Sequence, residues 1–406
     1  MKKEKNTRWL KVRSLLNTIH LWLGVGSGLI LFVVCLSGTV YTFSTEIQKI
    51  TDAELYTVEA RPGSKRLPAT TLIDQVQHAQ GPGIVQTVVI PEAENGSYQV
   101  TLVIPEAAPT DAPPKGGQGG GKRTTFFIDP YSGKVLGTNE TNSSAFFGFM
   151  FRLHRWLLLD TAIGRPIVGV ATMIFILIIL TGLVIWFPKK VKNWRQGLRI
   201  KTSANWKRVN HDLHNALGLY ASVFLLVMAL TGLTWSFEWY KKGVTNVFGG
   251  GQRAEQAPLQ STVVHGATAS LETYQLAADK VLAYGGDYRF SLPADSLGVV
   301  NVSKTKNTFF ATSVADRLTL DQYSGAVLKT ELFSEKPLNE KILSSIKAIH
   351  IGSFYGTFSK IIYFIACLIG TSLPVTGVMI WINKLRKKKK RSTSSEEIED
   401  EQSVAA

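Results

Sequence analysis

Long apolar runs separate the polar parts of this chain. Four runs are long enough to cross a bilayer, which takes about 20 apolar residues, and they are Leu21–Phe43, Pro166–Phe187, Asn215–Phe237 and Lys360–Ile382. They contain no Asp, Glu or Arg, and their only lysine opens the last run. We therefore predict a membrane protein, mainly α-helical, with four transmembrane helices.

Basic residues collect beside three ends of these runs. Six precede the first run, eight lie in the 188–208 connection and seven follow the fourth run. Because cytoplasmic flanks are enriched in Lys and Arg, we expect both termini and this connection in the cytoplasm. The net charge of +15 is then mostly a signal of topology. We expect the lipid bilayer, and no nucleic acid, as a partner.

This topology divides the chain into nine predicted parts. In order they are a cytoplasmic basic N-terminus at 1–19, a first span at 20–43, a first outer domain with a short pre-membrane helix at 44–153, a pre-membrane segment and second span at 154–187, a cytoplasmic basic loop at 188–210, a third span at 211–237, a second outer domain at 238–349, a pre-membrane segment and fourth span at 350–382, and a cytoplasmic charged tail at 383–406.

The two outer segments combine helical and strand-like patterns. Apolar spacing predicts one helix in each, at 70–80 and 271–284. Alternating or continuous apolar residues with β-branched side chains predict strands. In the first segment these are 85–90, 98–104, 124–128 and 133–136, and in the second they run through Phe290, Val302 and Phe310. The Pro-, Gly- and Lys-rich stretch 107–123 predicts a mobile loop. Each outer segment is thus predicted to be a small α+β domain.

The two halves of the chain resemble each other. His20 to Phe43 aligns without gaps on His214 to Phe237, with 8 identities in 24 positions. The turns at 129–136 and 321–328 share Asp, Tyr-Ser-Gly and Val-Leu, and the span ends at 181–186 and 376–381 share Thr-Gly and Ile-Trp. Because both copies begin in the cytoplasm, we predict a parallel internal repeat about an axis along the membrane normal.

Four histidines occupy repeat-related positions at the membrane ends. His20 and His214 lie at the inner ends of the first and third spans, and His154 and His350 lie just before the second and fourth. Each pair can approach the repeat axis from two sides, which is the geometry of bis-imidazole ligation of haem iron. The remaining histidines are His211, which could replace His214 as a ligand, and His78 and His265, which we interpret as ordinary surface residues.

Glycines and arginines near these histidines fit the same interpretation. Gly24 and Gly218 follow their histidines by one helical turn, which leaves room for a flat macrocycle. Arginines near the membrane ends could pair with haem propionates, namely Arg13 and Arg208 inside and Arg152, Arg155 and Arg165 outside. Three alternatives stay open: interfacial polar histidines, a metal site at His211 and His214, and glycines that only permit close helix packing.

Other chemistry finds little support in the sequence. The only cysteines, Cys35 and Cys367, lie inside spans and cannot staple the outer domains. Gly116 to Lys122 has phosphate-loop spacing, but Arg123 replaces the required Ser or Thr and the segment is predicted to lie outside. No nucleotide-binding fingerprint occurs in the inner segments. We therefore expect any electron donor to be a separate cytoplasmic or membrane molecule.

The chain resembles the PepSY-associated transmembrane protein family. The matching features are His20 with Gly24, Asp212-Leu213-His214 with Gly218, Leu153-His154-Arg155-Trp156, and the repeated turns and span ends. The resemblance covers nearly the whole chain, and the Gly-rich stretch 115–121 is an insertion outside the family pattern. Family members include ferric-siderophore reductases of the bacterial inner membrane with two b-type haems. The resemblance implies two haem b groups and outer domains with PepSY-like α+β folds.

Two functions follow for testing. The first is a haem-dependent ferric-siderophore (ferric-chelate) reductase, which takes electrons from the cytoplasmic side and reduces a chelate in the periplasm. Reduction would release iron because hard oxygen donors favour the ferric ion. The second is a non-catalytic membrane-anchored PepSY module that binds or restrains an extracytoplasmic peptidase or peptide. The paired histidines favour the first.

Overall fold

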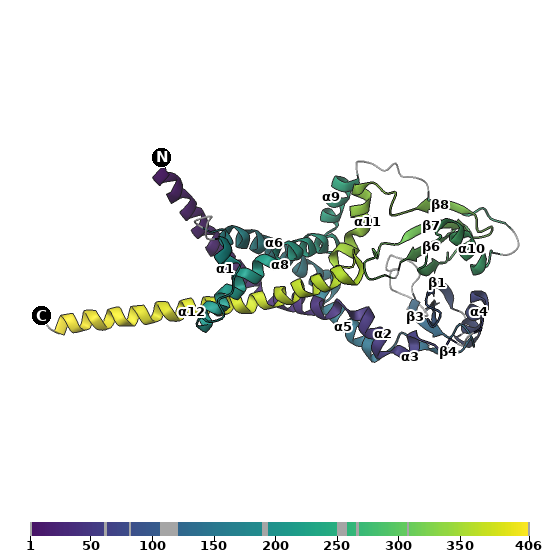
Figure 1. The fold of residues 1–406 in the computed structure, drawn as a ribbon, viewed down its shortest axis with the longest axis horizontal. Coiled ribbons are helices and arrows are strands. Elements are labelled where there is room, and N and C mark those ends of the chain that lie inside the picture. The colour runs from purple at the N-terminus through teal and green to yellow at the C-terminus, as the bar shows by residue number, and fades with distance from the viewer. Residues whose placement is uncertain are drawn as a thin grey trace, which may run out of the picture.

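The protein is an elongated helical bundle that carries a β-sheet at one end (Figure 1). The computed structural model describes residues 2–60, 63–80, 83–105, 121–188, 194–249, 258–264, 268–306 and 308–404. Both ends of the described chain lie at the end of the bundle opposite the sheet. The two outer segments are thus gathered on one side, as the charge pattern predicts.

Four long helices form the bundle. They are α1 (Lys2–Tyr41), α6 (Thr161–Trp186), α8 (Trp206–Ser236) and α12 (Gly356–Val404). Each contains a stretch long and apolar enough to cross a membrane, which confirms the prediction of four transmembrane helices. Helices α1 and α8 both pack against α6 and α12, so α1 and α8 face each other across the bundle.

The helices extend beyond the apolar runs that predict them. Helix α1 begins at Lys2, so the basic N-terminal segment continues the first span as helix, and α12 continues through the charged tail to Val404. Long straight-chain charged residues are good helix formers, which explains why the helices persist outside the apolar region. Cys35 and Cys367 are free, buried thiols in α1 and α12.

Short helices connect the bundle to the sheet. Helix α5 (Asn142–Trp156) packs on α1 and α6, and α11 (Leu338–His350) packs on α8 and α9 (Glu238–Gly249). Helix α5 starts where the Thr141 side chain accepts a hydrogen bond from the Ser144 amide and ends where Leu157 adopts a φ of 55°. The remaining connectors are α2 (Ser44–Thr51), α3 (Ala53–Tyr56) and, on the inner side, α7 (Trp194–Gly197).

The outer segments together build one eight-stranded antiparallel sheet. The strand order is β4-β3-β2-β1-β5-β6-β7-β8. The strands are β1 (Ile84–Ile90), β2 (Tyr98–Pro105), β3 (Gly121–Ile128), β4 (Val135–Thr138), β5 (Asp287–Ser291), β6 (Val299–Thr305), β7 (Asp316–Asp321) and β8 (Val327–Glu331). Strands β1 and β5 join the two segments, with Val88 opposite Phe290. Each segment thus contributes four strands, and neither has a sheet of its own.

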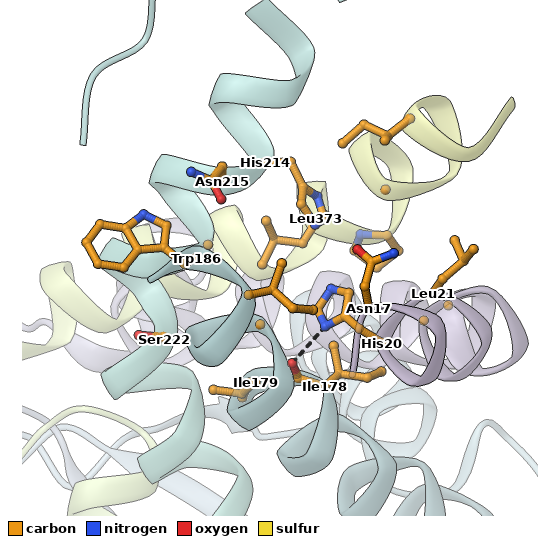
Figure 2. A pocket seen from close by; sticks show the side chains of 18 of the residues that line it. Asn17, His20, Leu21, Ile178, Ile179, Trp186, His214, Asn215, Ser222 and Leu373 are labelled. Carbon is orange, nitrogen blue, oxygen red and sulfur yellow. Dashed lines mark hydrogen bonds between the residues drawn. The ribbon is translucent and has the colours of Figure 1, made fainter. Parts of the chain in front are cut away.

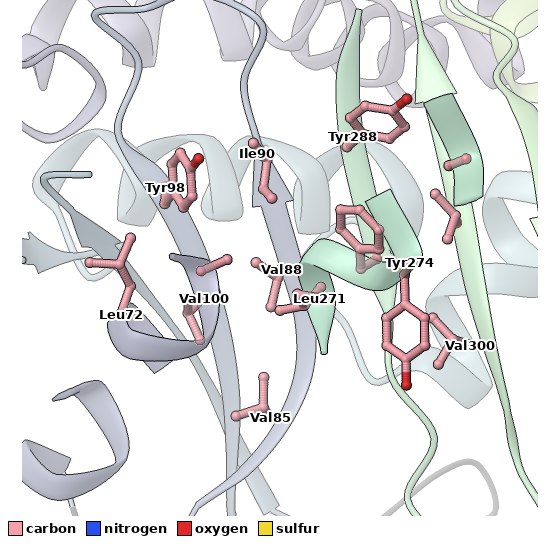
Figure 3. Close-up of a cluster of buried hydrophobic side chains, with 14 of the residues drawn as sticks. Leu72, Val85, Val88, Ile90, Tyr98, Val100, Leu271, Tyr274, Tyr288 and Val300 are labelled. Carbon is pink, nitrogen blue, oxygen red and sulfur yellow. The ribbon is translucent and has the colours of Figure 1, made fainter. Parts of the chain in front are cut away.

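Helices α4 (Ala69–Gln80) and α10 (Leu271–Val281) supply the apolar cover of this sheet. Leu72 and Leu271 are buried with Val88, Phe290 and neighbouring side chains in one continuous core (Figure 3). Alternate strand residues face this core because side chains change face at every residue of a strand. Burial of both helices against one sheet therefore holds the two outer segments together.

Several sequence predictions of the outer region are confirmed, and others are wrong. Helices α4 and α10 and strands β1, β2, β3, β5 and β6 lie where expected. The strand through Phe310 is wrong, because this residue lies in a turn against Phe358 and the next strand is β7. Strand β4 begins two residues later than the predicted strand 133–136, because backbone hydrogen bonds keep 129–134 in a turn. Of the predicted loop, 106–120 lies outside the described residues and 121–123 belongs to β3.

Candidate functional site

The structure brings the four histidines together as two pairs. His20 on α1 and His214 on α8 have ring centroids 6.4 Å apart towards the end of the bundle opposite the sheet, and we call them the inner pair. His154 on α5 and His350 on α11 have ring centroids 6.3 Å apart near the sheet. The partners are those that the sequence repeat predicts, and no contact joins a histidine of one pair to the other.

This spacing fits two imidazoles on opposite sides of one iron. An imidazole nitrogen lies ~2 Å from a metal that it binds and the ring centroid about 1 Å further, so two axial imidazoles have centroids ~6 Å apart. Both pairs match this distance. Within the described parts of the chain, no group of three or more His, Cys, Asp and Glu side chains could hold a metal ion. Each pair thus offers two axial ligands, the number that a bis-imidazole haem takes from a protein.

A hydroxyl residue followed by glycine on a neighbouring helix supports each histidine. We call these four dipeptides the histidine seats; they are Ser37-Gly38 for His154, Thr181-Gly182 for His20, Thr231-Gly232 for His350 and Thr376-Gly377 for His214. Thr-Gly is part of the sequence repeat at 181–182 and 376–377, but the repeat alone indicates no role for it. The helical turn that carries each seat contributes a polar contact to the histidine ring, and the seat glycine leaves an open surface beneath the ring.

The polar contact of each seat engages the Nδ1 atom of its histidine. His20 Nδ1 lies 3.0 Å from the Ile178 carbonyl, His154 Nδ1 lies 2.9 Å from the Val34 carbonyl and His350 Nδ1 lies 3.0 Å from the Met228 carbonyl. In each case the carbonyl belongs to the residue three positions before the seat hydroxyl. Because a carbonyl can only accept, Nδ1 must carry the proton and Nε2 must keep its lone pair.

His214 reaches the same tautomer through a hydroxyl. Its Nδ1 lies 2.9 Å from Thr376 Oγ1. That hydroxyl donates to the carbonyls of Ser372 and Leu373, each at 3.1 Å, so its oxygen accepts from Nδ1. All four histidines therefore present a bare Nε2, which makes no hydrogen bond among the described residues and is free to ligate a metal.

The glycine of each seat is needed because the imidazole lies directly on it. A Cβ atom added to Gly38, Gly182 or Gly232 would lie 3.0 to 3.1 Å from Cε1 of the seated histidine, and one added to Gly377 would lie 3.3 Å away. An added Cβ would therefore require the imidazole to shift by a few tenths of an ångström. The glycines thus permit the close approach that brings each ring within reach of its carbonyl or hydroxyl.

Helix geometry explains how α1 and α8 serve both pairs. On α1, Gly38 follows His20 by 18 residues, and on α8, Gly232 follows His214 by 18 residues. Eighteen residues make about five turns and rise ~27 Å. The histidine at one end of each helix and the seat at its other end therefore lie on the same helix face. The two pairs are separated by most of the ~30 Å thickness of a hydrocarbon core.

A cavity of about 230 Å³ opens around the inner pair (Figure 2). His20 and His214 line it from α1 and α8, and apolar residues such as Ile179 and Leu373 line its walls. Gly24 and Gly218 also line it; a Cβ on Gly24 would meet nothing within 4 Å, and one on Gly218 would meet only Leu373 at 3.7 Å. The donor set, the cavity and these two glycines fit a flat, largely apolar macrocycle at this pair.

His211 lies apart from the inner pair, at the mouth of the cavity. It lines the opening with Asn17 and Lys384, and its side chain is 59% exposed. Its Nδ1 lies 3.7 Å from Asp212, which also binds Arg208. The ring contact of His20 is with His214, so the geometry favours His214 as the second inner ligand.

The arginines predicted to hold propionates have different surroundings. Arg13 donates to the carbonyls of Phe187 and Ile185 at the end of α6, and Arg208 binds Asp212. Neither is therefore free for an inner propionate without giving up a partner. Arg152 is exposed on α5. Arg155 lies over the ring of Trp156, 5.2 Å from its centroid.

The two histidines of the outer pair are held in their neutral form. Burial lowers the pKa of His154, and burial together with the nearby His154 lowers the pKa of His350 to about 4, so both are neutral at pH 7. Neutral imidazole is the form that ligates metals.

Two polar groups near the outer pair lack partners. On helices α5 and α11, Trp156 Nε1 and Ser345 Oγ are buried without a hydrogen-bond partner among the described residues. A carboxylate near Arg155 would satisfy the Trp156 donor.

The family described as PepSY-associated TM region matches residues 18–384. The chain belongs to this family. The match begins two residues before His20 and ends at Lys384, so it covers both histidine pairs and all four seats of this PepSY-associated protein. No curated protein matches the chain.

We expect Gly182→Ala to weaken haem binding at the inner pair. The added methyl would meet the His20 ring at 3.1 Å and displace it by a few tenths of an ångström. Haem content and visible spectra of the purified protein measure the effect. Gly26→Ala on α1 is the matched control, because its methyl meets nothing within 4 Å. Equal haem content in both variants would contradict the role of the seat.

We expect His211→Ala to keep the inner haem with a shifted potential, whereas His214→Ala loses it. Only His214 lies against His20 and in a seat, and His211 is exposed at the cavity mouth. Haem spectra and redox titration of both variants make the comparison. Loss of haem in His211→Ala with retention in His214→Ala would move the ligand by one turn.

Proposed function

We propose that the protein binds two b-type haems, one at each histidine pair, and carries electrons across the bacterial inner membrane to a ferric chelate such as a ferric siderophore. The observation that supports this most is the repeated spacing of about 6 Å between seated imidazoles. A single pair could be accidental, but two pairs at opposite ends of one bundle, each on the same kind of seat, require a common purpose.

The histidines and seats would hold the cofactor, and bound haem would supply a one-electron carrier at each pair. His20 and His214 would ligate the inner iron, and His154 and His350 the outer iron. Gly24 and Gly218 leave the space that the inner ring needs. The apolar residues between the pairs, including Ile179 and Leu225, exclude water from the path between them.

The proposed direction follows from charge. Basic residues flank the inner ends of the spans, so the termini and the 188–210 loop are assigned to the cytoplasm and the sheet to the periplasm. In this assignment each half is one parallel repeat, and its outer part is a PepSY-like α+β unit. The inner pair would then receive electrons from a separate cytoplasmic or membrane donor, and the outer pair would face the chelate.

One electron passed to the chelate converts its ferric ion to the ferrous ion, and the donor is oxidised by the same amount. The hard oxygen donors of a siderophore bind ferrous iron less tightly, so the iron is released. No residue of this chain needs to form a bond to the chelate. The protein's task is to hold two carriers at fixed positions and to shield them from water.

Haem binding and chelate reduction can be tested together on the purified chain. We expect close to two haems per chain by pyridine haemochrome assay and low-spin spectra. After reduction with dithionite and removal of excess, mixing with a ferric trihydroxamate should reoxidise the haem and release ferrous iron to a ferrous-specific dye. His350→Ala should keep the inner haem and reduce the chelate slowly.

Two results would contradict this proposal. Absence of haem in protein from haem-replete cells would remove the cofactor and favour a non-catalytic module that binds or restrains an extracytoplasmic peptidase or peptide. If two haems are present but stay reduced when mixed with the chelate, the electron-transfer hypothesis would stand and the ferric chelate would be rejected as the acceptor.

A further inference from the structure

We infer that the threonine hydroxyls of three seats lower the redox potential of the iron that their histidines serve, whereas the serine hydroxyl of the fourth seat does not. This inference rests on the proposed haem binding. It concerns Thr181, Thr231 and Thr376, which touch histidines and not the iron, and which therefore act as positioning residues.

The inner pair has two such hydroxyls. Thr181 Oγ1 lies 3.1 Å from His20 Nδ1, and Thr376 Oγ1 lies 2.9 Å from His214 Nδ1. Thr181 Oγ1 donates its own proton to the Leu177 carbonyl at 2.8 Å, so its oxygen is free to accept from the imidazole. His20 thus donates to both a carbonyl and a hydroxyl, and His214 donates to a hydroxyl.

The outer pair has one threonine hydroxyl within hydrogen-bond distance of a histidine. Thr231 Oγ1 lies 3.1 Å from His350 Nδ1, and it donates to the Val227 carbonyl at 2.7 Å. The equivalent hydroxyl of Ser37 donates to the Val33 and Val34 carbonyls, at 2.7 and 3.0 Å. It forms no hydrogen bond with His154 in the described structure, where His154 Nδ1 is paired with the Val34 carbonyl.

The position of the ring explains this difference. A Cβ built on Gly38 lies 3.1 Å from His154 Nδ1, whereas the corresponding distances to Nδ1 at the other three seats are 3.6 to 3.8 Å. His154 therefore lies closer to its glycine than the other histidines do. Its Nδ1 reaches the carbonyl but not the serine, although the serine hydroxyl bonds its own helix as the threonines do.

Hydrogen bonds at Nδ1 change the ligand strength of Nε2. An acceptor at Nδ1 draws the proton away from the ring and leaves more electron density on the nitrogen that faces the iron. A more basic axial ligand stabilises ferric over ferrous iron and lowers the potential. Removing a seat hydroxyl that accepts from Nδ1 should therefore raise the potential of the iron that this histidine serves.

Potentiometric titration of haem-loaded variants tests the inference. We expect Thr181→Val and Thr376→Val to raise the inner potential, with a larger rise in the double variant, and Thr231→Val to raise the outer potential. The inner potential is read in a His350→Ala background and the outer potential in a His20→Ala background, so each titration reports one haem. Thr231→Ser, which keeps the hydroxyl, should restore the outer potential.

The outer pair provides a matched control. Ser37→Ala removes a seat hydroxyl that does not reach its histidine, so the outer potential should stay unchanged. Should Thr231→Val fail to bind haem, Thr231→Ala removes the same hydroxyl with less change in shape. The inference is overturned if Ser37→Ala and Thr231→Val shift the outer potential equally, or if none of the threonine variants shifts a potential. Absence of haem from the unsubstituted chain would instead reject the proposed function itself.

Discussion

The hydrogen bond at Nδ1 is the contact on which the histidine pairs depend. A buried imidazole without a partner costs several kcal/mol, on the order of 2–7 for a polar group without compensation. In this protein a helix carbonyl or a threonine hydroxyl meets that demand at every pair. The same bond fixes the tautomer, because a carbonyl accepts only from a protonated Nδ1. Burial, orientation and readiness to ligate thus follow from one interaction.

Helix geometry and the sheet place these contacts. The spacing of 18 residues between ligand and seat on α1 and α8 puts both on one face of each helix. The outer histidines, His154 and His350, lie on α5 and α11, which follow the last strand of each outer segment. Because β1 and β5 join these segments into one sheet, the two outer histidines belong to a single body. The pair at the membrane surface is therefore positioned by the same core that closes the sheet.

The sequence predicts the spans and the histidine pairs because both depend on local pattern. Apolar length identifies the spans, and the repeat that aligns His20 with His214 also gives the partners. The seats could not be found in this way, since Thr181 contacts a histidine 161 residues away in sequence and only packing shows which helices meet. The single sheet was missed for the same reason, because alternation in β1 and β5 predicts strands but not which strands pair. Arg13 shows a further limit, since its role depends on where α6 ends.

Electron paramagnetic resonance of the oxidised protein tests the central claim most directly, because it reports the axial ligands of each iron and the angle between their planes. The imidazole planes meet at 86° in the inner pair and 59° in the outer pair. Two low-spin ferric signals of equal intensity are predicted, and the more anisotropic one should belong to the nearly perpendicular inner pair and disappear in His20→Ala. High-spin signals, a single species, or loss of both signals in His20→Ala with the fold intact would contradict two independent bis-histidine sites.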